Sequence, residues 1–569
     1  MASPALYGLA FGIGVASHIF WFNGREHHFY ANSYVGTTLL ILAGGTSALC
    51  KGYGLPLREA FTSTSTLVAT ILAGLYTSLT IYRLFLNPLN AFPGPYWVRL
   101  GNLAWSSQLT NFDAYYKLKA LHDTHGDIVR IGSHDLSIID PEAMEISYGV
   151  KAKASKSPWY EGDYPLSSMH TTRSKTLHDK RRRVWAPAFS DKALREYETQ
   201  LDHFNDKVLT RLREFKGGAV NVTKWFNLYS FDVMGRLAFG KDYGMLDSGE
   251  KHWALQLLSD GMQPLGLNLP TWLFRMLTSV PFLAAGYHKF VKFCTEETVW
   301  RVQNDGKKGA GGGMDIMGWL LKAYKDIPHP EQDTMLHADA RLIIVAGSDT
   351  TAATLTYLFY HLAQEPAIVE QIREELRPLT QGEWHDKDIH NCATLNGAIN
   401  EALRLHPPVP SGVQRTTPKE GMHIGETFIP GGTQYWMPQY VMGRGMPLTF
   451  PSPSQPHTLT EPKTNNPLPP DERTYPSAPS FLPSRWSSQP HLIKHKDAFA
   501  PFSTGPFGCI GKQLAYMQIR TLTARILLEF DVEFAPGEDG NRILTQTKDH
   551  FTLDVGALDL VFTPLGRGK

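Results

Sequence analysis

The pattern of apolar and polar residues divides the chain into an apolar start and a longer mixed region. Three apolar stretches, residues 5–22, 34–50 and 66–86, contain no charged side chain except Arg83 near the end of the third. About 20 apolar residues in a helix cross the hydrocarbon core of a bilayer. Residues 1–90 are therefore predicted to form a membrane anchor with one to three transmembrane helices.

The second stretch is short and rich in Gly, Ser and Thr, so an interfacial helix is an alternative for it. The third ends in Tyr82 and Arg83, residue types that favour the membrane interface. Three spans would place the N-terminus in the lumen and the rest of the chain in the cytosol.

Prolines end the anchor and introduce the second region. Pro88, Pro93 and Pro95 prevent the third helix from continuing. After them, helical periodicity dominates and short strand patterns interrupt it. We expect residues 91–569 to form one domain that is mainly α with small β-sheets.

Composition and cysteine spacing exclude several classes of protein. The net charge of +1 gives no support for nucleic-acid binding. The four cysteines are far apart and contain no CxxC pair, which indicates neither a disulfide framework nor a zinc ribbon. A reducing compartment suits them.

Cys509 lies in a glycine-rich segment directly before an amphipathic helical pattern at residues 512–530. The backbone N–H groups and the dipole at a helix N-terminus lower the pKa of a thiol, so this position is predicted to hold a thiolate. Gly505 and Gly511 allow tight turns and the close approach of a flat macrocycle, and Phe502 offers an apolar cover. A buried structural cysteine is the alternative.

A long apolar helical pattern at residues 341–361 is interrupted by Gly347, Asp349 and Thr350. Such a helix must be buried, and its polar residues lower helix propensity in the middle. The hydroxyl groups can bond back to the preceding turn and open a groove. A groove that receives dioxygen, with Thr350 donating a hydrogen bond and Asp349 relaying protons, is one interpretation; a kinked core helix is the other.

Glu401 and Arg404 lie three residues apart on a predicted helix, where their side chains can pair. Arg485, in a Phe-x-Pro-x-Arg-Trp segment, is a third member if the pair is buried. An ordinary surface salt bridge is the alternative.

Together, and in this order, these motifs resemble the cytochrome P450 haem-thiolate monooxygenases, in particular the microsomal fungal members. The resemblance covers essentially everything after Ile81. It implies the cytochrome P450 fold, with haem b (iron protoporphyrin IX) as cofactor and Cys509 as the axial iron ligand. It also implies that Asp349 and Thr350 activate oxygen, that Glu401, Arg404 and Arg485 form a structural triad, and that residues 342–345 line the distal pocket.

The same resemblance implies electrons from NADPH, delivered by a flavoprotein reductase, and attachment to the endoplasmic reticulum with the catalytic domain facing the cytosol. His178 and Arg182 match family positions that contact the haem propionates, and Arg415 is a further candidate. The family usually has an arginine two residues before the cysteine, where this chain has Phe507. We therefore expect His178, Arg182 and Arg415 to contribute more to propionate binding. A basic surface that meets the reductase is expected at Lys175, Lys180, Arg181 and Lys512, with a merely solvated face as the alternative.

A Pro-, Thr- and Ser-rich segment at residues 445–470 departs from the family pattern. Its removal joins Arg444 to Asp471 at the usual spacing, and its codons can be read with splice-donor, branch-point and acceptor signals at consistent positions. An unspliced intron in the gene sequence is therefore one hypothesis, and a genuine disordered insertion is the other. Sequencing of the mature transcript distinguishes them.

The sequence thus predicts a membrane-bound monooxygenase that oxidises a lipophilic small molecule, with fungal secondary metabolism as its setting. Residues 262–287 resemble the membrane-dipping roof through which such substrates enter, or are ordinary core helices. A haem-thiolate isomerase or dehydratase without a reductase is an alternative function, and an inactive product of a mis-spliced transcript is another.

Overall fold

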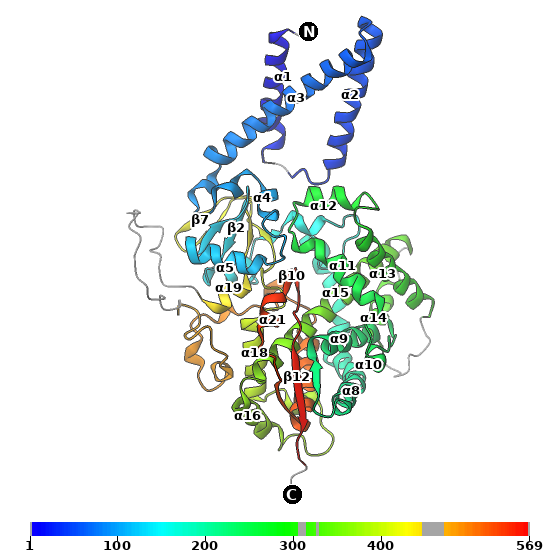
Figure 1. Cartoon of the computed structure of the whole chain (residues 1–569), viewed down its shortest axis with the longest axis vertical. Coiled ribbons are helices and arrows are strands. Elements are labelled where there is room, and N and C mark those ends of the chain that lie inside the picture. The colour runs from blue at the N-terminus through cyan, green and yellow to red at the C-terminus, as the bar shows by residue number, and fades with distance from the viewer. Residues whose placement is uncertain (1–2, 25, 305–313, 326–328, 446–471, 567–569) are drawn as a thin grey trace.

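The computed structural model describes residues 3–24, 26–304, 314–325, 329–445 and 472–566. Three helices project from one end of a large domain, and the C-terminus lies at the opposite end (Figure 1). The predicted insertion at residues 445–470 lies outside the described residues except for Gly445.

The projecting helices are α1 (Pro4–Ser17), continued by a π-turn at His18–Phe22, then α2 (Ala31–Tyr53) and α3 (Leu57–Ile81), continued by a π-turn at Tyr82–Leu86. All three are long and apolar enough to cross a membrane, and only 6–17% of their most apolar windows is buried. The helix over residues 334–362 has a similar hydropathy, but 67% of its window is buried. Protein therefore covers the apolar surface of that helix, whereas the first three leave most of theirs exposed, as helices that span a membrane do.

Helices α1 and α3 pack closely because glycines face the contact. A Cβ atom on Gly14 would collide with the backbone of Ile71, and one on Gly74 would collide with the backbone of Phe11. Small residues at such crossings are typical of helix pairs in membranes.

The loop between α1 and α2 rests on the large domain. His28 Nε2 lies 2.9 Å from a Glu161 carboxylate oxygen, and the Phe29 ring lies 5.1 Å from that of Tyr164. Asn32, at the start of α2, donates a 2.9 Å hydrogen bond to Ser279. The loop and the large domain therefore lie on the same side of the three helices, an arrangement that fits three spans.

Helix α15 (His329–Leu362) forms the centre of the large domain. It packs against α9 (Val222–Phe239), α13 (Ala285–Gln303), α18 (Ala393–Leu405) and α20 (Lys512–Glu529). Because its apolar residues occur on every face, only burial from all sides removes them from water. The main hydrophobic core is built around it.

Short strands form the remaining framework. A five-stranded sheet has the order β1-β2-β8-β5-β3, in which only β2 and β8 are parallel. Its strands are β1 (Ile128–Arg130), β2 (Asp135–Ile138), β8 (Gln434–Trp436), β5 (Arg415–Thr416) and β3 (Ser155–Lys156). A second core of apolar residues packs on this sheet.

A three-stranded sheet joins β4 (Ala219–Asn221), β12 (Asp559–Pro564) and β9 (Phe530–Phe534), and two hairpins pair β6 (Met422–Ile424) with β7 (Thr427–Ile429) and β10 (Lys548–His550) with β11 (Thr552–Asp554). The other helices are α4 (Asn102–Ser106), α5 (Ala114–His125), α6 (Glu142–Tyr148), α7 (Lys175–Trp185), α8 (Asp191–Glu214), α10 (Met245–Ser248), α11 (Trp253–Gly266), α12 (Thr271–Thr278), α14 (Ile316–Tyr324), α16 (Pro366–Leu376), α17 (Asp386–Ile389), α19 (Gln439–Arg444) and α21 (Asn541–Gln546). The predicted class, mainly α with small sheets, is confirmed.

Candidate active site

The Cys509 loop lies directly before α20. Its backbone is held by a 2.8 Å hydrogen bond from Cys509 N–H to the carbonyl of Phe502. Gly505 has φ +63°, and a Cβ atom there would collide with the carbonyl of Tyr148 at the end of α6. Only glycine fits this close approach in the left-handed region. Gly511 lies so close that a Cβ atom on it would be 3.9 Å from the Cys509 sulfur.

The thiol of Cys509 does not have the lowered pKa that its place before a helix predicted. Desolvation raises the pKa, and it outweighs the N–H groups of Gly511 and Lys512 and the charges of Arg182 and Lys512, which act in the opposite direction. The prediction included the effect of the helix terminus on the pKa, but it did not include desolvation by the surrounding protein. A thiolate at this position therefore needs a further cation beside it, which a bound metal supplies.

The side chain of Cys509 is nevertheless exposed, although the protein around it desolvates the thiol and raises its pKa. Ala346, in the middle of the buried helix α15, is exposed as well. Helix α7 links the two regions: Arg182 donates to the carbonyl of Gly508 at 2.6 Å, and Arg181 donates to Asp339 of α15 at 2.8 Å. Cys509 and Ala346 are thus both accessible, as residues that contact a bound cofactor must be.

Cations gather around Phe507, where the family usually has an arginine. The His178 ring lies 4.6 Å from the Phe507 ring, Lys156 Nζ lies 4.8 Å from it, and Arg415 Cζ lies 5.3 Å from it. Lys156 and Arg415 are direct cross-strand partners in β3 and β5, and both are almost fully buried. Like charges directly opposite each other destabilise a sheet.

These two cations have no carboxylate partner among the described residues. Lys156 Nζ bonds only to the carbonyls of Met169 at 3.2 Å and His170 at 2.6 Å, and Arg415 Nε is buried without a partner. Desolvation and the charge of Arg415 lower the pKa of Lys156 far below its usual value. Buried cations normally have an anion, so this cluster fits an anionic group such as a haem propionate.

Lys156 was missed by sequence reasoning, because a single lysine in a short strand carries no recognisable pattern. His178 and Arg415 were predicted, and the structure brings both to Phe507. Desolvation lowers the pKa of His178 to about 4, so at neutral pH it is a neutral donor or acceptor.

Asp349 and Thr350 lie on α15. Thr350 Oγ1 donates a 2.7 Å hydrogen bond to the carbonyl of Ala346, so the predicted back-bonding is present, while the helix stays continuous. Thr552 donates to Asp349 at 3.4 Å. Desolvation, helped by the charge of Asp554, raises the pKa of Asp349 to about 7. This carboxyl can therefore hold or release a proton near neutral pH.

The Glu401, Arg404 and Arg485 side chains form a buried triad rather than a surface pair. Glu401 accepts from Arg404 at 2.7 Å, from Arg485 at 3.1 Å and from Trp486 at 2.9 Å. Burial alone raises the pKa of Glu401, but these hydrogen bonds and charges hold it below the usual value. Because removing one partner from a buried ion pair costs roughly 3–5 kcal/mol, the triad fixes the segment around Arg485 to α18.

The predicted basic surface is wrong at Arg181, which is buried and paired with Asp339. Lys175 pairs with Asp179 at 2.6 Å. Lys180 and Lys512 are exposed. The sequence pattern does not show which side of α7 faces α15, so it could not separate the buried Arg181 from the exposed Lys180.

A cavity of about 140 Å³ lies beside α15 and is lined by Leu342 and Val345 of the predicted distal segment. Ile343 and Ile344 are buried in the core instead. Residues 262–287 contribute Met262, Leu265 and Phe274 to the lining, so part of this stretch forms the cavity wall.

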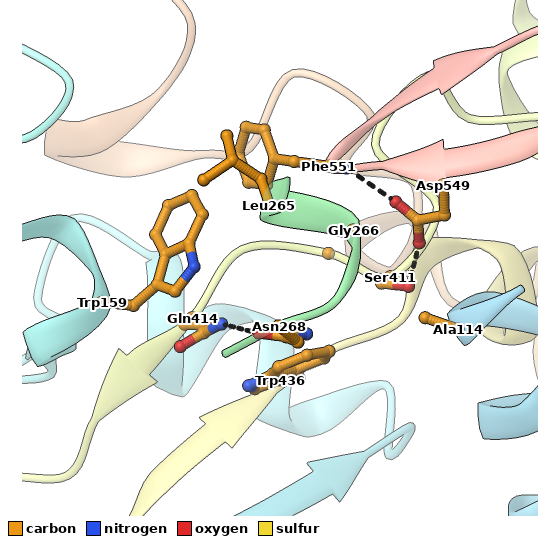
Figure 2. Close-up of a pocket in the computed structure, with 11 residues that line it drawn as sticks. Ala114, Trp159, Leu265, Gly266, Asn268, Ser411, Gln414, Trp436, Asp549 and Phe551 are labelled. Atoms are coloured by element: carbon orange, nitrogen blue, oxygen red, sulfur yellow. Dashed lines mark hydrogen bonds between the residues drawn. The ribbon is translucent and has the colours of Figure 1, made fainter. Parts of the chain in front are cut away.

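A second pocket, of about 20 Å³, shares Trp159, Leu265 and Phe551 with the larger cavity. Figure 2 shows that Phe551 is held at its edge by the Asp549 carboxylate, which accepts from the Phe551 N–H at 3.0 Å and from Ser411 at 2.5 Å. Phe551 has φ +79°, which is rare for an aromatic residue. The strained turn places this ring between the two pockets.

The family model for cytochrome P450 matches residues 92–455 and 468–557. The chain belongs to the cytochrome P450 family. The unmatched residues between these ranges lie within the predicted insertion. A solved structure, the haem domain of cytochrome P450DA, has a TM-score of 0.64 at 18% identity over 83% of this chain and 98% of that one, and it shows the same fold.

Related fungal proteins are similar over almost the whole chain. Cytochrome P450 monooxygenase notG' of Aspergillus versicolor is 41% identical over 99% of both chains, and monooxygenase lcsK of Purpureocillium lilacinum is 40% identical over 97% of both. Tryprostatin B 6-hydroxylase of Aspergillus fumigatus is 37% identical over 97% of this chain and 95% of that one. These relatives support the prediction of a haem-dependent cytochrome P450 monooxygenase over an isomerase or dehydratase.

Membership of the family implies a haem cofactor and electrons from a redox partner. The accessible thiol of Cys509 and the basic side chains around Phe507 fit a haem with two propionates.

The cluster around Phe507 predicts that Lys156→Met weakens haem retention. We expect haem transfer to apomyoglobin to become about tenfold faster, because a hydrogen bond to a charged group is lost. Adding Phe507→Arg to this variant restores a cation and should slow the transfer again. Lys153→Met is the control, because Lys153 is exposed. Equal transfer rates in Lys156→Met and the wild type would contradict the assignment.

Proposed function

We propose that this cytochrome P450 oxidises a lipophilic small molecule in fungal secondary metabolism, with electrons from NADPH. The cavity beside α15 supports this proposal, because its wall is largely apolar and aromatic. The fungal relatives support it as well, since one is named as a hydroxylase of tryprostatin B.

In this proposal Cys509 would hold the haem iron through its sulfur, and Phe502, Gly505 and Gly511 shape the loop that carries it. Lys156, His178, Arg182 and Arg415 bind the propionates. Bound haem supplies the activation of dioxygen and the insertion of one oxygen atom into the substrate. The protein positions the substrate's C–H bond and limits the entry of water.

Asp349 and Thr350 serve as the proton-delivery pair. The raised pKa of Asp349 supports this role, because a carboxyl that titrates near pH 7 both accepts and donates protons at neutral pH. Thr350 donates to the Ala346 carbonyl, and its hydroxyl must turn away from that carbonyl to pass a proton onward.

The proposed electron donor is an NADPH-dependent flavoprotein reductase on the endoplasmic reticulum. Lys180 on α7 and Lys512, three residues after Cys509, are both exposed. They are the remaining candidates for a surface that attracts an acidic partner. Three spans place the N-terminus in the lumen and the catalytic domain in the cytosol. Residues 445–470 are an insertion relative to the family pattern. They are either an unspliced intron in the gene sequence or a genuine insertion in the mature protein.

Replacement of Cys509 by alanine tests the function as a whole. The reduced, carbon-monoxide-bound wild type should show the long-wavelength band of a thiolate haem and should oxidise substrate only with NADPH, reductase and dioxygen. Cys509→Ala should lose both properties, because it lacks the sulfur. Cys294→Ala, a change at a buried cysteine in α13, should keep them. Turnover of wild-type protein without NADPH would instead support an isomerase or dehydratase.

Asp349→Asn should reduce turnover by about a hundredfold, because a positioned acid–base group is lost. Wild-type turnover should fall as pH rises through about 7, where Asp349 loses its proton. The raised pKa also means that the stability contributed by protonated Asp349 is complete below its ordinary pKa of 3.8 and is lost as pH rises through about 7. The variant should lack both dependences in rate profiles and thermal melts.

Asp554→Asn is the matched control for this prediction. The Asp554 charge raises the pKa of Asp349, so its removal should shift the inflection to lower pH while turnover is kept. An unchanged inflection in Asp349→Asn would show that another group controls the rate.

The three-span topology predicts where a glycosylation sequon is modified. In microsomes, a sequon inserted in the loop at residues 54–56 should be glycosylated, and one in the loop at residues 26–30 should not, because only the first lies in the lumen. The native sequon at Asn221 should stay unmodified and is an internal control. Modification of the loop at residues 26–30 would rule out this orientation.

A further inference from the structure

A polar cluster interrupts the apolar wall of the cavity beside α15. Arg341 of α15, Asp163 of the loop after residue 161 and Tyr287 of α13 all line this cavity. Arg341 Nη1 lies 3.1 Å from an Asp163 carboxylate oxygen and 3.0 Å from the Tyr287 hydroxyl, which donates to the other Asp163 oxygen. The three side chains thus form one hydrogen-bonded unit.

The guanidinium of Arg341 has donors that the protein does not use. An arginine side chain offers five N–H groups, and Asp163 and Tyr287 engage only Nη1. Nε is buried without a partner, and Nη2 has no hydrogen bond to any of the described residues. The side chain is only 10% exposed, so water compensates for little of the deficit at the buried Nε.

The charge of the cluster indicates which acceptor suits these donors. Asp163 already neutralises Arg341, and Tyr287 is uncharged because desolvation raises its pKa. A second carboxylate would give the cavity a net negative charge. A neutral oxygen acceptor, such as a ketone or amide carbonyl, would use the free N–H groups without this cost.

The aromatic lining of the cavity suits a flat apolar group. The rings of Trp159 and Phe551 are stacked, with centroids 5.0 Å apart and planes 30° apart. Tyr160, Phe274 and Phe290 also line the cavity. Aromatic ligands gain favourable offset or edge contacts with such rings in addition to the burial of apolar area.

We propose that the substrate is a largely apolar aromatic molecule with a neutral carbonyl group, and that Arg341 donates a hydrogen bond to this carbonyl. The proposal rests on the proposed function, since it names the substrate class of the same site. Arg341 is a specificity-determining residue in it and takes no part in oxygen chemistry.

The position of Arg341 also sets where oxidation occurs. Arg341 and Asp349 are eight residues apart on one helix, which corresponds to a rise of about 12 Å. A carbonyl held at Arg341 is therefore far from the proton-delivery pair, and the oxidised carbon lies toward the other end of the substrate.

Two nearly isosteric probes test the proposal in the full-length holoprotein. Methyl naphthyl ketone has a carbonyl oxygen at the position where isopropenylnaphthalene has a methylene group. By equilibrium dialysis, the wild type should bind the ketone about tenfold more tightly, because only the ketone accepts a charge-assisted hydrogen bond. Equal affinities would overturn the proposal, and so would tighter binding of naphthoate than of the ketone.

Three variants identify the donor. Arg341→Lys keeps the charge beside Asp163 but lacks the planar set of donors, and the double variant Asp163→Asn/Arg341→Met removes the ion pair as a unit. Both should bind the two probes within about twofold of each other. Tyr287→Phe should keep the preference for the ketone, because Arg341 remains. A ketone preference that survives in both arginine variants, or that disappears in Tyr287→Phe alone, would overturn the role of Arg341.

The carbon-monoxide spectrum separates failure of this inference from failure of the proposed function. A wild type with the thiolate band but no ketone preference rejects only the inference. A wild type without that band rejects the proposed function, and the dialysis result still decides the role of Arg341.

Discussion

Two buried basic side chains, directly opposite each other on neighbouring strands, determine the charge around Phe507, where we propose that haem binds. Lys156 and Arg415 are directly paired in register, and no described carboxylate neutralises them. A sheet tolerates such a pair only if another anion is present or if one cation loses its proton. The lowered pKa of Lys156 is the second solution, and the haem propionate that we propose here would be the first. In this proposal, cofactor binding stabilises the sheet.

The contrast with the Glu401 triad shows how buried charge is used in two ways. Glu401 accepts hydrogen bonds from two arginines and a tryptophan, so its charge is fully compensated by the chain itself and fastens one segment to α18. Around Phe507 and at Arg341 the chain supplies cations with unused donors. The paired charge of Glu401 stabilises the fold, whereas we propose that the unused donors of Arg415 and Arg341 bind ligands.

The sequence was sufficient for the fold class and for the apolar N-terminal helices, because both depend on local patterns. Cys509 precedes a helix, and Glu401 and Arg404 share one helical turn, so their neighbours are close in sequence. Lys156 and Arg341 could not be predicted, because their partners come from distant strands and helices. The predicted lowering of the Cys509 pKa was wrong for the same reason. The helix terminus is a local feature, whereas desolvation depends on the packing of the entire domain.

The anchor and the cavity share one segment of chain. The loop between α1 and α2 contacts Glu161 and Tyr164, and these residues flank Gly162 and Asp163, which line the cavity. Asp163 in turn pairs with Arg341 on α15. Hydrogen bonds and ring contacts thus run from the N-terminal helices to the cation that lines the cavity. A simple tether requires no such contacts, so the loop between α1 and α2 also helps to position the wall of this cavity.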